Sequence, residues 1–239
     1  VGATMTKDFT SALKTTGRII DSWMPWRIRY EQVPGMAVGL VYKGKLVYGG
    51  GFGYSDIESN LPVTEDTCFR IASLSKTFTA VAMMQLVERG MVSIDDRVQR
   101  YLPWFKAKNG EVDSKNITIR QLLSHSGGVF RDGNTPHWVD DQFPSVLALK
   151  KSVMKKSLVQ DNNTGFKYSN FGFALLGEVI SKVTGTKYDD YVMENIIKPL
   201  GMNRTAPDFH KAHLPWLAKG YSRIIPGEER EAFPHCATN

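Results

Sequence analysis

A serine and a lysine stand three positions apart in the run IASLSK, at Ser73 and Lys76. The residues that follow predict a helix over 74–89 that ends at Gly90, so both side chains lie on one face of its first turn. Unpaired N–H groups and the positive end of the helix dipole there stabilise negative charge on oxygen. Burial favours the neutral form of a lysine, which can accept a proton. The pair predicts a nucleophilic Ser73 activated in part by Lys76.

The same two residues also have a purely structural interpretation. Ser73 could simply cap the helix while Lys76 lies on its surface, since S-x-x-K spacing often arises by chance. The apolar side chains of the helix cover most of its circumference, which predicts a buried helix. A lysine in such surroundings needs a buried partner or a cleft, and this favours the catalytic interpretation. The apolar residues are Leu74, Phe78, Val81, Ala82, Met83, Met84, Leu86 and Val87.

A second group of polar residues, Tyr168-Ser169-Asn170, precedes another amphipathic helix. A tyrosine beside an ammonium group is pushed towards phenolate, which could act as general base towards Ser73 and later as acid towards the leaving group. The structural alternative is that Tyr168 packs against the helix and Asn170 is its N-cap. His125 stands near two glycines, and with no second histidine at ligand spacing a role in loop packing is favoured over catalysis or metal binding.

The elements that must position these residues divide the chain into two lobes. Apolar residues near helical spacing predict an opening helix after Asp8 that packs on a sheet. Two β-rich runs, 36–42 and 45–52, are joined by Lys43-Gly44 and predict a hairpin whose second strand carries glycines that allow another backbone to approach closely.

The remainder of the chain is mainly helical. Thr118 caps a predicted short helix, 170–183 predicts a helix that stops at Gly185, and Thr186 caps a last helix before Pro199. Only weak strand signals follow, near 218–225. The predicted class is α/β (α+β), one domain over 1–239 with a sheet lobe (1–70 and about 206–239) and a helical lobe (71–205).

Taken together, the motifs resemble the superfamily of serine β-lactamases, DD-peptidases and penicillin-binding proteins. The resemblance is to the branch with class C β-lactamases, D-aminopeptidases, D-alanyl-D-alanine carboxypeptidases and family VIII esterases. The resemblance spans about 33–205, with Ser73-x-x-Lys76 as first motif and Tyr168-x-Asn170 as second. Further similar segments are VPGMAV (33–38), QLLSHSGG (121–128) and PLGM (199–202). The implied fold is β-lactamase/transpeptidase-like, an antiparallel sheet lobe plus a helical lobe.

The resemblance also implies roles. Ser73 would be acylated, Lys76 and Tyr168 would activate it and protonate the leaving group, and Asn170 would bind the amide side chain of the substrate. No metal or organic cofactor is implied. The expected reaction is hydrolysis of an amide, peptide or β-lactam through a covalent acyl-enzyme. The alternatives are an esterase, an acylated sensor, and a non-catalytic peptidoglycan-binding or self-assembling protein.

One family motif is not recognisable. A Lys- or His-x-Gly strand, which lines the site opposite the serine and contributes an oxyanion N–H, is expected well after the second motif but is not found before Asn239. The chain is therefore interpreted as a C-terminally truncated part of a longer protein, weakly active or inactive unless another chain supplies strands. The unpaired hairpin edge would invite association or homo-oligomers.

Composition excludes few function classes. The formal net charge is +6, but no dense Lys/Arg stripe interleaves with aromatic residues, so no nucleic-acid partner is expected. No apolar run has the length of a membrane helix, and Cys68 and Cys236 are too far apart in sequence to argue a disulfide. The expected partners are a small-molecule or peptide substrate and, through the unpaired strand edge, further copies of the chain. Localisation stays open, with the periplasm, the exterior or the cell envelope favoured.

Overall fold

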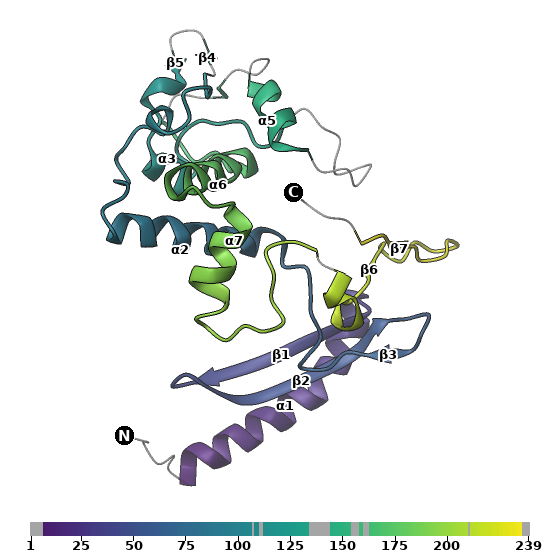
Figure 1. Cartoon of the computed structure of the whole chain (residues 1–239). Coiled ribbons are helices and arrows are strands. Elements are labelled where there is room, and N and C mark those ends of the chain that lie inside the picture. Colours follow the sequence, from purple (N-terminus) through teal and green to yellow (C-terminus); the bar gives the residue numbers. More distant parts are fainter. Residues whose placement is uncertain are drawn as a thin grey trace. The chain divides into compact units, whose positions relative to one another are not determined.

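The computed structural model describes residues 7–106, 108–109, 112–133, 144–153, 158–159, 163–209 and 211–235 (Figure 1). The chain divides into two compact units. Among the described residues, those of 7–70 and 211–235 form the sheet unit, and those between 71 and 209 form the helical unit. That the two units work as one catalytic domain stays a prediction, and Cys236 lies outside the described residues.

The sheet unit is built on an antiparallel hairpin of β1 (Gly35–Tyr42) and β2 (Lys45–Asp56), with β3 (Leu61–Pro62) on the far side of β2. Lys43 and Gly44 both have positive φ, as a two-residue turn of this kind requires, so the predicted hairpin is confirmed. A Cβ on Gly51 would overlap the Val63 carbonyl, which confirms the predicted close approach of another backbone.

Helix α1 (Lys7–Glu31) packs against β2, as expected. The Tyr48 hydroxyl donates to Asp21 Oδ1 at 2.7 Å, and the rings of Phe9 and Tyr42 lie 4.2 Å apart between centroids. The predicted start after Asp8 was wrong, because Asp8 lies inside the helix and so is not its N-cap. Trp23 in the same helix is 49% exposed.

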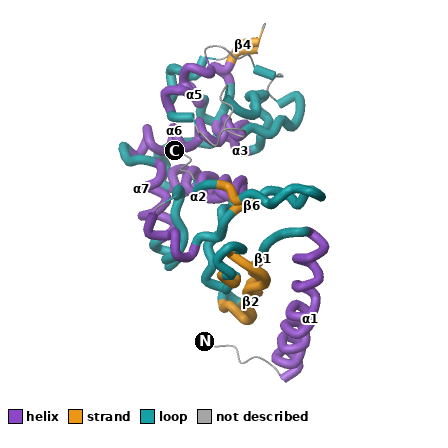
Figure 2. Tube along the Cα trace, turned by 90° about the vertical axis from the view of Figure 1, so that its right-hand side faces the viewer, coloured by secondary structure: helices purple, strands orange, loops and turns teal. Residues whose placement is uncertain are grey.

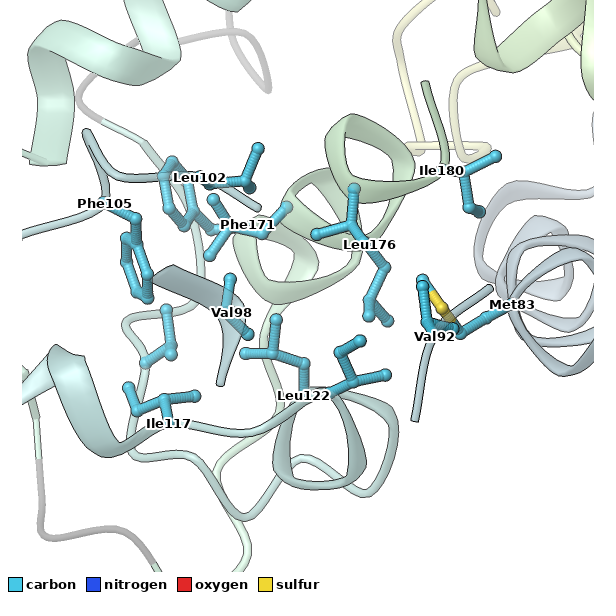
Figure 3. Close-up of a cluster of buried hydrophobic side chains, with 14 of the residues drawn as sticks. Met83, Val92, Val98, Leu102, Phe105, Ile117, Leu122, Phe171, Leu176 and Ile180 are labelled. Atoms are coloured by element: carbon cyan, nitrogen blue, oxygen red, sulfur yellow. The ribbon is translucent and has the colours of Figure 1, made fainter. Parts of the chain in front are cut away.

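The helical unit encloses an apolar core around α6 (Asn170–Thr184), which packs against α2 (Ser75–Glu88), α3 (Ile119–Leu123) and α7 (Tyr188–Val192). Figure 3 shows side chains from α2, α3, α6 and the intervening loops pointing into one cluster. Its members include Met83, Val98, Phe105, Ile117, Leu122, Phe171, Leu176 and Ile180, all 5% exposed or less.

The ends of these helices follow the predicted signals in most cases. Thr118 caps α3 with a reciprocal bond pattern to Gln121, and Gly185 ends α6 in the left-handed conformation. Thr186 does not cap α7, because the cap position is Lys187 and its side chain makes no capping bond. A π-helical turn over 193–197 continues α7, and Pro199 follows its end as expected.

Helix α2 corrects a prediction of burial. Its buried residues Thr79, Ala82, Met83 and Leu86 face the core, whereas Leu74, Val81 and Met84 are 43–67% exposed. The helix is therefore not buried all round: its apolar residues spread over the circumference, but only one side packs on the core of the unit.

The remaining described elements are short (Figure 2). They are 3-10 turns over Val98–Arg100, Ser114–Asn116 and Lys211–Trp216, the two-stranded pairs β4 (Lys108–Asn109) with β5 (Val112–Asp113) and β6 (Gly220–Tyr221) with β7 (Ala232–Phe233), and α5 (Val146–Val153). The predicted weak strand signals correspond to β6.

Candidate active site

Ser73 lies in a short 3-10 turn, Ala72–Leu74, directly before α2. The turn is entered through Ala72 with φ +44°, a left-handed conformation that is uncommon outside glycine and asparagine. The cap position of α2 is Leu74 and no side chain caps the helix, so Ser73 is not its N-cap. The turn leaves the Ser73 side chain exposed, within reach of groups on other elements.

The structure brings all four expected site residues together within the helical unit. The Ser73 and Tyr168 hydroxyl oxygens are 2.6 Å apart, and Lys76 Nζ donates to Ser73 Oγ at 3.2 Å. Lys76 Nζ also donates to Asn170 Oδ1 at 2.7 Å. These distances allow protons to pass between the serine, the phenol and the amine without a further group.

Tyr168 and Asn170 flank Ser169, and the hydrogen bonds of Ser169 fix the start of α6. Ser169 is the true N-cap: its hydroxyl accepts from Gly172 N at 2.7 Å and donates to the Phe130 carbonyl at 2.7 Å. The alternative that Asn170 is the cap is therefore wrong. Its side chain is free of capping and reaches Lys76 instead.

The Asn170 amide lies between opposite charges. Its Oδ1 accepts from the Lys76 ammonium, and its Nδ2 donates to Asp132 Oδ1 at 2.7 Å. An ammonium requires an acceptor and a carboxylate requires a donor, so this pair of neighbours determines which way the amide points. Asp132 in turn contacts the Arg131 guanidinium at 3.3 Å.

Tyr168 is in an environment that favours its phenolate. Burial would raise the pKa of its phenol, but the hydrogen bonding of Lys76 and Ser73 and the positive charges of Lys76 and Arg131 outweigh burial, and the pKa lies below the ordinary value for tyrosine. The Lys76 ammonium lies 4.8 Å from the centre of the ring. A phenol of this kind is better suited to accept the serine proton than an ordinary tyrosine.

A cavity of ≈ 1010 Å³ adjoins these residues. Ser73, Lys76 and Asn170 line one part of it, and it continues along α6 past Ala174 and Gly177. Tyr188 also lines it, and its hydroxyl is 2.8 Å from the Thr79 hydroxyl. The volume is sufficient for a drug-sized molecule or a short peptide segment.

Three residues of the site were missed or undervalued in the sequence. Arg131 and Asp132 are adjacent charged residues, and their sequence alone does not link them to the site. The fold places Asp132 against Asn170 and Arg131 near the Tyr168 ring. His125 is packed in a loop, as expected, with its ring 4.6 Å from that of Tyr168. Within the described residues, no group of three or more His, Cys, Asp or Glu side chains could hold a metal ion.

The fold and these motifs define a β-lactamase/transpeptidase-like protein with an antiparallel sheet and helices, as the sequence predicted. Residues 26–233 match the model of the Beta-lactamase family, and the chain belongs to that family. "Protein flp" of Staphylococcus aureus (strain MW2) is 30% identical over 187 residues, which are 78% of this chain and 37% of the relative. The chain thus spans well under half the length of that relative.

Two solved structures extend the comparison. The octameric penicillin-binding protein homologue from Pyrococcus abyssi is 30% identical with a TM-score of 0.76, over 91% of this chain and 50% of that one. EstCE1, described as a hydrolase with promiscuous acyltransferase activity, is 25% identical with a TM-score of 0.79, over 93% and 60% of the two chains. The predicted superfamily of serine β-lactamases and penicillin-binding proteins is confirmed. No helix among the described residues has the length and apolarity needed to cross a bilayer.

Proposed function

We propose that this protein is a serine hydrolase that forms a covalent acyl-enzyme on Ser73. The observation that carries the proposal is the contact of Ser73 Oγ with both the Tyr168 hydroxyl, at 2.6 Å, and the Lys76 ammonium, at 3.2 Å, beside a large cavity. A serine hydroxyl is a weak nucleophile until a neighbouring base takes its proton. Here Tyr168, with its lowered pKa, is that base.

Acylation follows from this geometry. Ser73 Oγ attacks the substrate carbonyl carbon while its proton moves to the Tyr168 oxygen, and Lys76 stabilises the negative charge during transfer. The bond from the carbonyl carbon to the leaving nitrogen or oxygen then breaks, and Tyr168 returns the proton to the leaving atom. In deacylation a water molecule takes the place of the leaving group and the same residues act in reverse, which releases the acid and restores Ser73.

The proposed substrate is an amide, a peptide or a β-lactam. The Asn170 amide supports this choice, since it lies in the cavity wall next to Lys76 and retains one further N–H and one further lone pair for a substrate amide. An ester is the second candidate. It is supported by the similarity to EstCE1, which is described as a hydrolase with promiscuous acyltransferase activity.

The test is covalent capture. The purified chain is incubated with a fluorescent penicillin or with p-nitrophenyl acetate, and the mass of the intact protein and of its peptides is measured. An adduct on the peptide that contains Ser73, absent from Ser73→Ala, supports the proposal. If neither reagent labels the chain or a C-terminally extended version, the protein is a binding or assembling member of the family and the proposal is wrong.

Two further proposals concern the wider protein. A strand bearing the unrecognised third motif would supply a second oxyanion donor, and loss of one such donor costs about 2.7–4 kcal/mol, or roughly 10²–10³ in rate. We expect the extended version to turn over faster by that factor. Among the described strands none pairs with the outer edge of β1, and an unpaired strand edge can associate with another chain. The similarity to a homologue described as octameric supports self-association of this protein in general.

A further inference from the structure

His125 is attached to the residues on both sides of Tyr168. Its carbonyl accepts from Lys167 N at 2.8 Å, and its Nδ1 accepts from Ser169 N at 3.1 Å. The imidazole also packs on the phenol ring, with 4.6 Å between centroids. One residue of a separate loop thus holds the backbone before the tyrosine, the backbone after it and the ring itself.

We propose that His125 is the positioning residue of Tyr168: as a neutral imidazole whose Nδ1 accepts from Ser169 N, it holds the phenol against Ser73. This inference rests on the proposed role of Tyr168 as base. Ser169 is anchored a second time through its hydroxyl, which bonds Gly172 and Phe130. The position of Tyr168, one residue before that anchor, depends on His125.

The hydrogen bond restricts the protonation state of the ring. An Nδ1 that accepts has no proton, so a neutral His125 carries its hydrogen on Nε2. Protonation would place a second N–H opposite the Ser169 N–H and break the contact. Among the described residues, the Lys76 ammonium from α2 acts on the ring through its charge, and the titratable Tyr168 phenol packs on it. Burial, and then the Lys76 charge, lower the pKa of His125, so the contact persists below the pH at which an ordinary histidine is protonated.

The backbone at this position allows a matched pair of variants. His125 has φ +57°, a conformation that asparagine and glycine tolerate better than other residues. His125→Asn removes the ring and its titration but places an amide oxygen near the position of Nδ1, so the acceptor is retained. His125→Gly removes the acceptor as well. The two variants therefore separate the hydrogen bond from backbone strain, and thermal unfolding checks that both fold.

The first readout does not require activity. Tyrosine labelled with ¹³C at Cζ reports the phenol pKa by NMR, Tyr168→Phe assigns the signal, and the other tyrosines serve as controls of folding. We expect the pKa of Tyr168 to lie below the ordinary value in the wild type and in His125→Asn. It should rise towards the ordinary value in His125→Gly, because the phenol loses its contact with Ser73 and Lys76.

The second readout is the rate of Ser73 acylation against pH. We expect His125→Gly to lose about 10²-fold at neutral pH, the scale of a misplaced catalytic group, and His125→Asn to restore most of the rate. The fall in rate at acid pH that comes from His125 should be absent from His125→Asn. An unchanged Tyr168 titration in His125→Gly, or an asparagine variant that behaves like the glycine variant, overturns the inference. If the wild type is not acylated at all, the proposed function fails, and the NMR titration still decides the role of His125.

Discussion

The two units bury their apolar residues very differently. In the helical unit a continuous cluster from α2, α3, α6, α7 and their loops is almost inaccessible to water. In the described part of the sheet unit, Met24 and Val63 are the only apolar residues that are fully buried. Apolar side chains there stay largely in water, among them Trp26 at 54% and Val41 at 68% exposed.

The difference indicates which unit carries the geometry of the site. Ser73, Lys76, Tyr168 and Asn170 all belong to the unit that has its own packed core, so their mutual distances rest on close packing. The sheet unit instead offers apolar surface and a strand edge, the properties of a surface that associates with other chain segments.

The largest effect is expected from loss of the nucleophile. Ser73→Ala should lower acylation by about 10⁴-fold or more, because the other groups of the site cannot form the covalent bond. Mass spectrometry with a fluorescent penicillin or an activated ester measures the loss. Thr77→Ala, an exposed change on the same segment, should leave labelling unchanged. Equal labelling of Ser73→Ala and the wild type would place the reactive group elsewhere.

The contrast between the cores can be measured with two leucines. Leu176→Ala removes a fully buried side chain of the helical unit and should lower the free energy of unfolding by about 2–5 kcal/mol. Leu46→Ala removes a side chain of the sheet unit that is 60% exposed and should change it by about 0.5 kcal/mol or less. Urea denaturation of both variants gives the comparison. Similar losses would mean that the exposed surface of the sheet unit is covered in solution.

A smaller effect is expected at the partner of Asn170. Asp132→Ala leaves the Asn170 Nδ2 group without its acceptor and frees the amide to turn, which should lower kcat/KM by about tenfold. Asp132→Asn keeps an acceptor oxygen and serves as the control. Steady-state kinetics on an amide substrate and on an ester should show the larger loss for the amide, and equal losses would argue against a role of Asn170 in amide recognition.

The smallest effect concerns two tyrosines bonded to aspartates, one in each unit. Burial and then a hydrogen bond to aspartate raise the pKa of both Tyr48, beside Asp21, and Tyr101, beside Asp96, to about 12. The pKa of each phenol is higher in the folded state than its unfolded value of about 10. The protonated phenol therefore contributes its full stabilisation at pH below about 10, and this contribution is lost as pH rises towards 12.

Tyr101→Phe and Tyr48→Phe should therefore reduce the fall in thermal stability between these pH values. The change for Tyr101 should exceed that for Tyr48, because Tyr101 lies against the packed helical unit. Melting curves at a series of alkaline pH values measure both. A larger change for Tyr48 would reverse the ranking of the two units.

The sequence predicted the local elements well where a residue type forces a conformation. Lys43-Gly44 demands a tight turn, Thr118 with Gln121 satisfies the first N–H groups of a helix, and Gly185 supplies a left-handed end. Such signals depend on nearby residues only. Failures occurred where two neighbouring residues compete for one role, as Ser169 and Asn170 do at the start of α6.

Contacts between distant segments were predictable only in part. The spacing of Ser73 and Lys76 pointed to a shared face, and the family resemblance joined them to Tyr168. The links to Asp132 and His125 have no local signature, because a loop brings each of them to α6. The burial of α2 was overestimated because an apolar helix sequence does not show which sides of the helix other elements will pack against.

The left-handed backbone at Ala72 limits what evolution or design can do beside the reactive serine. Glycine and asparagine adopt this conformation readily, alanine tolerates it, and branched side chains such as valine or isoleucine do not. If all amino acids were tried at position 72, those that cannot adopt a left-handed backbone would be excluded whatever the substrate. The backbone that presents Ser73 is thus constrained by the residue before it.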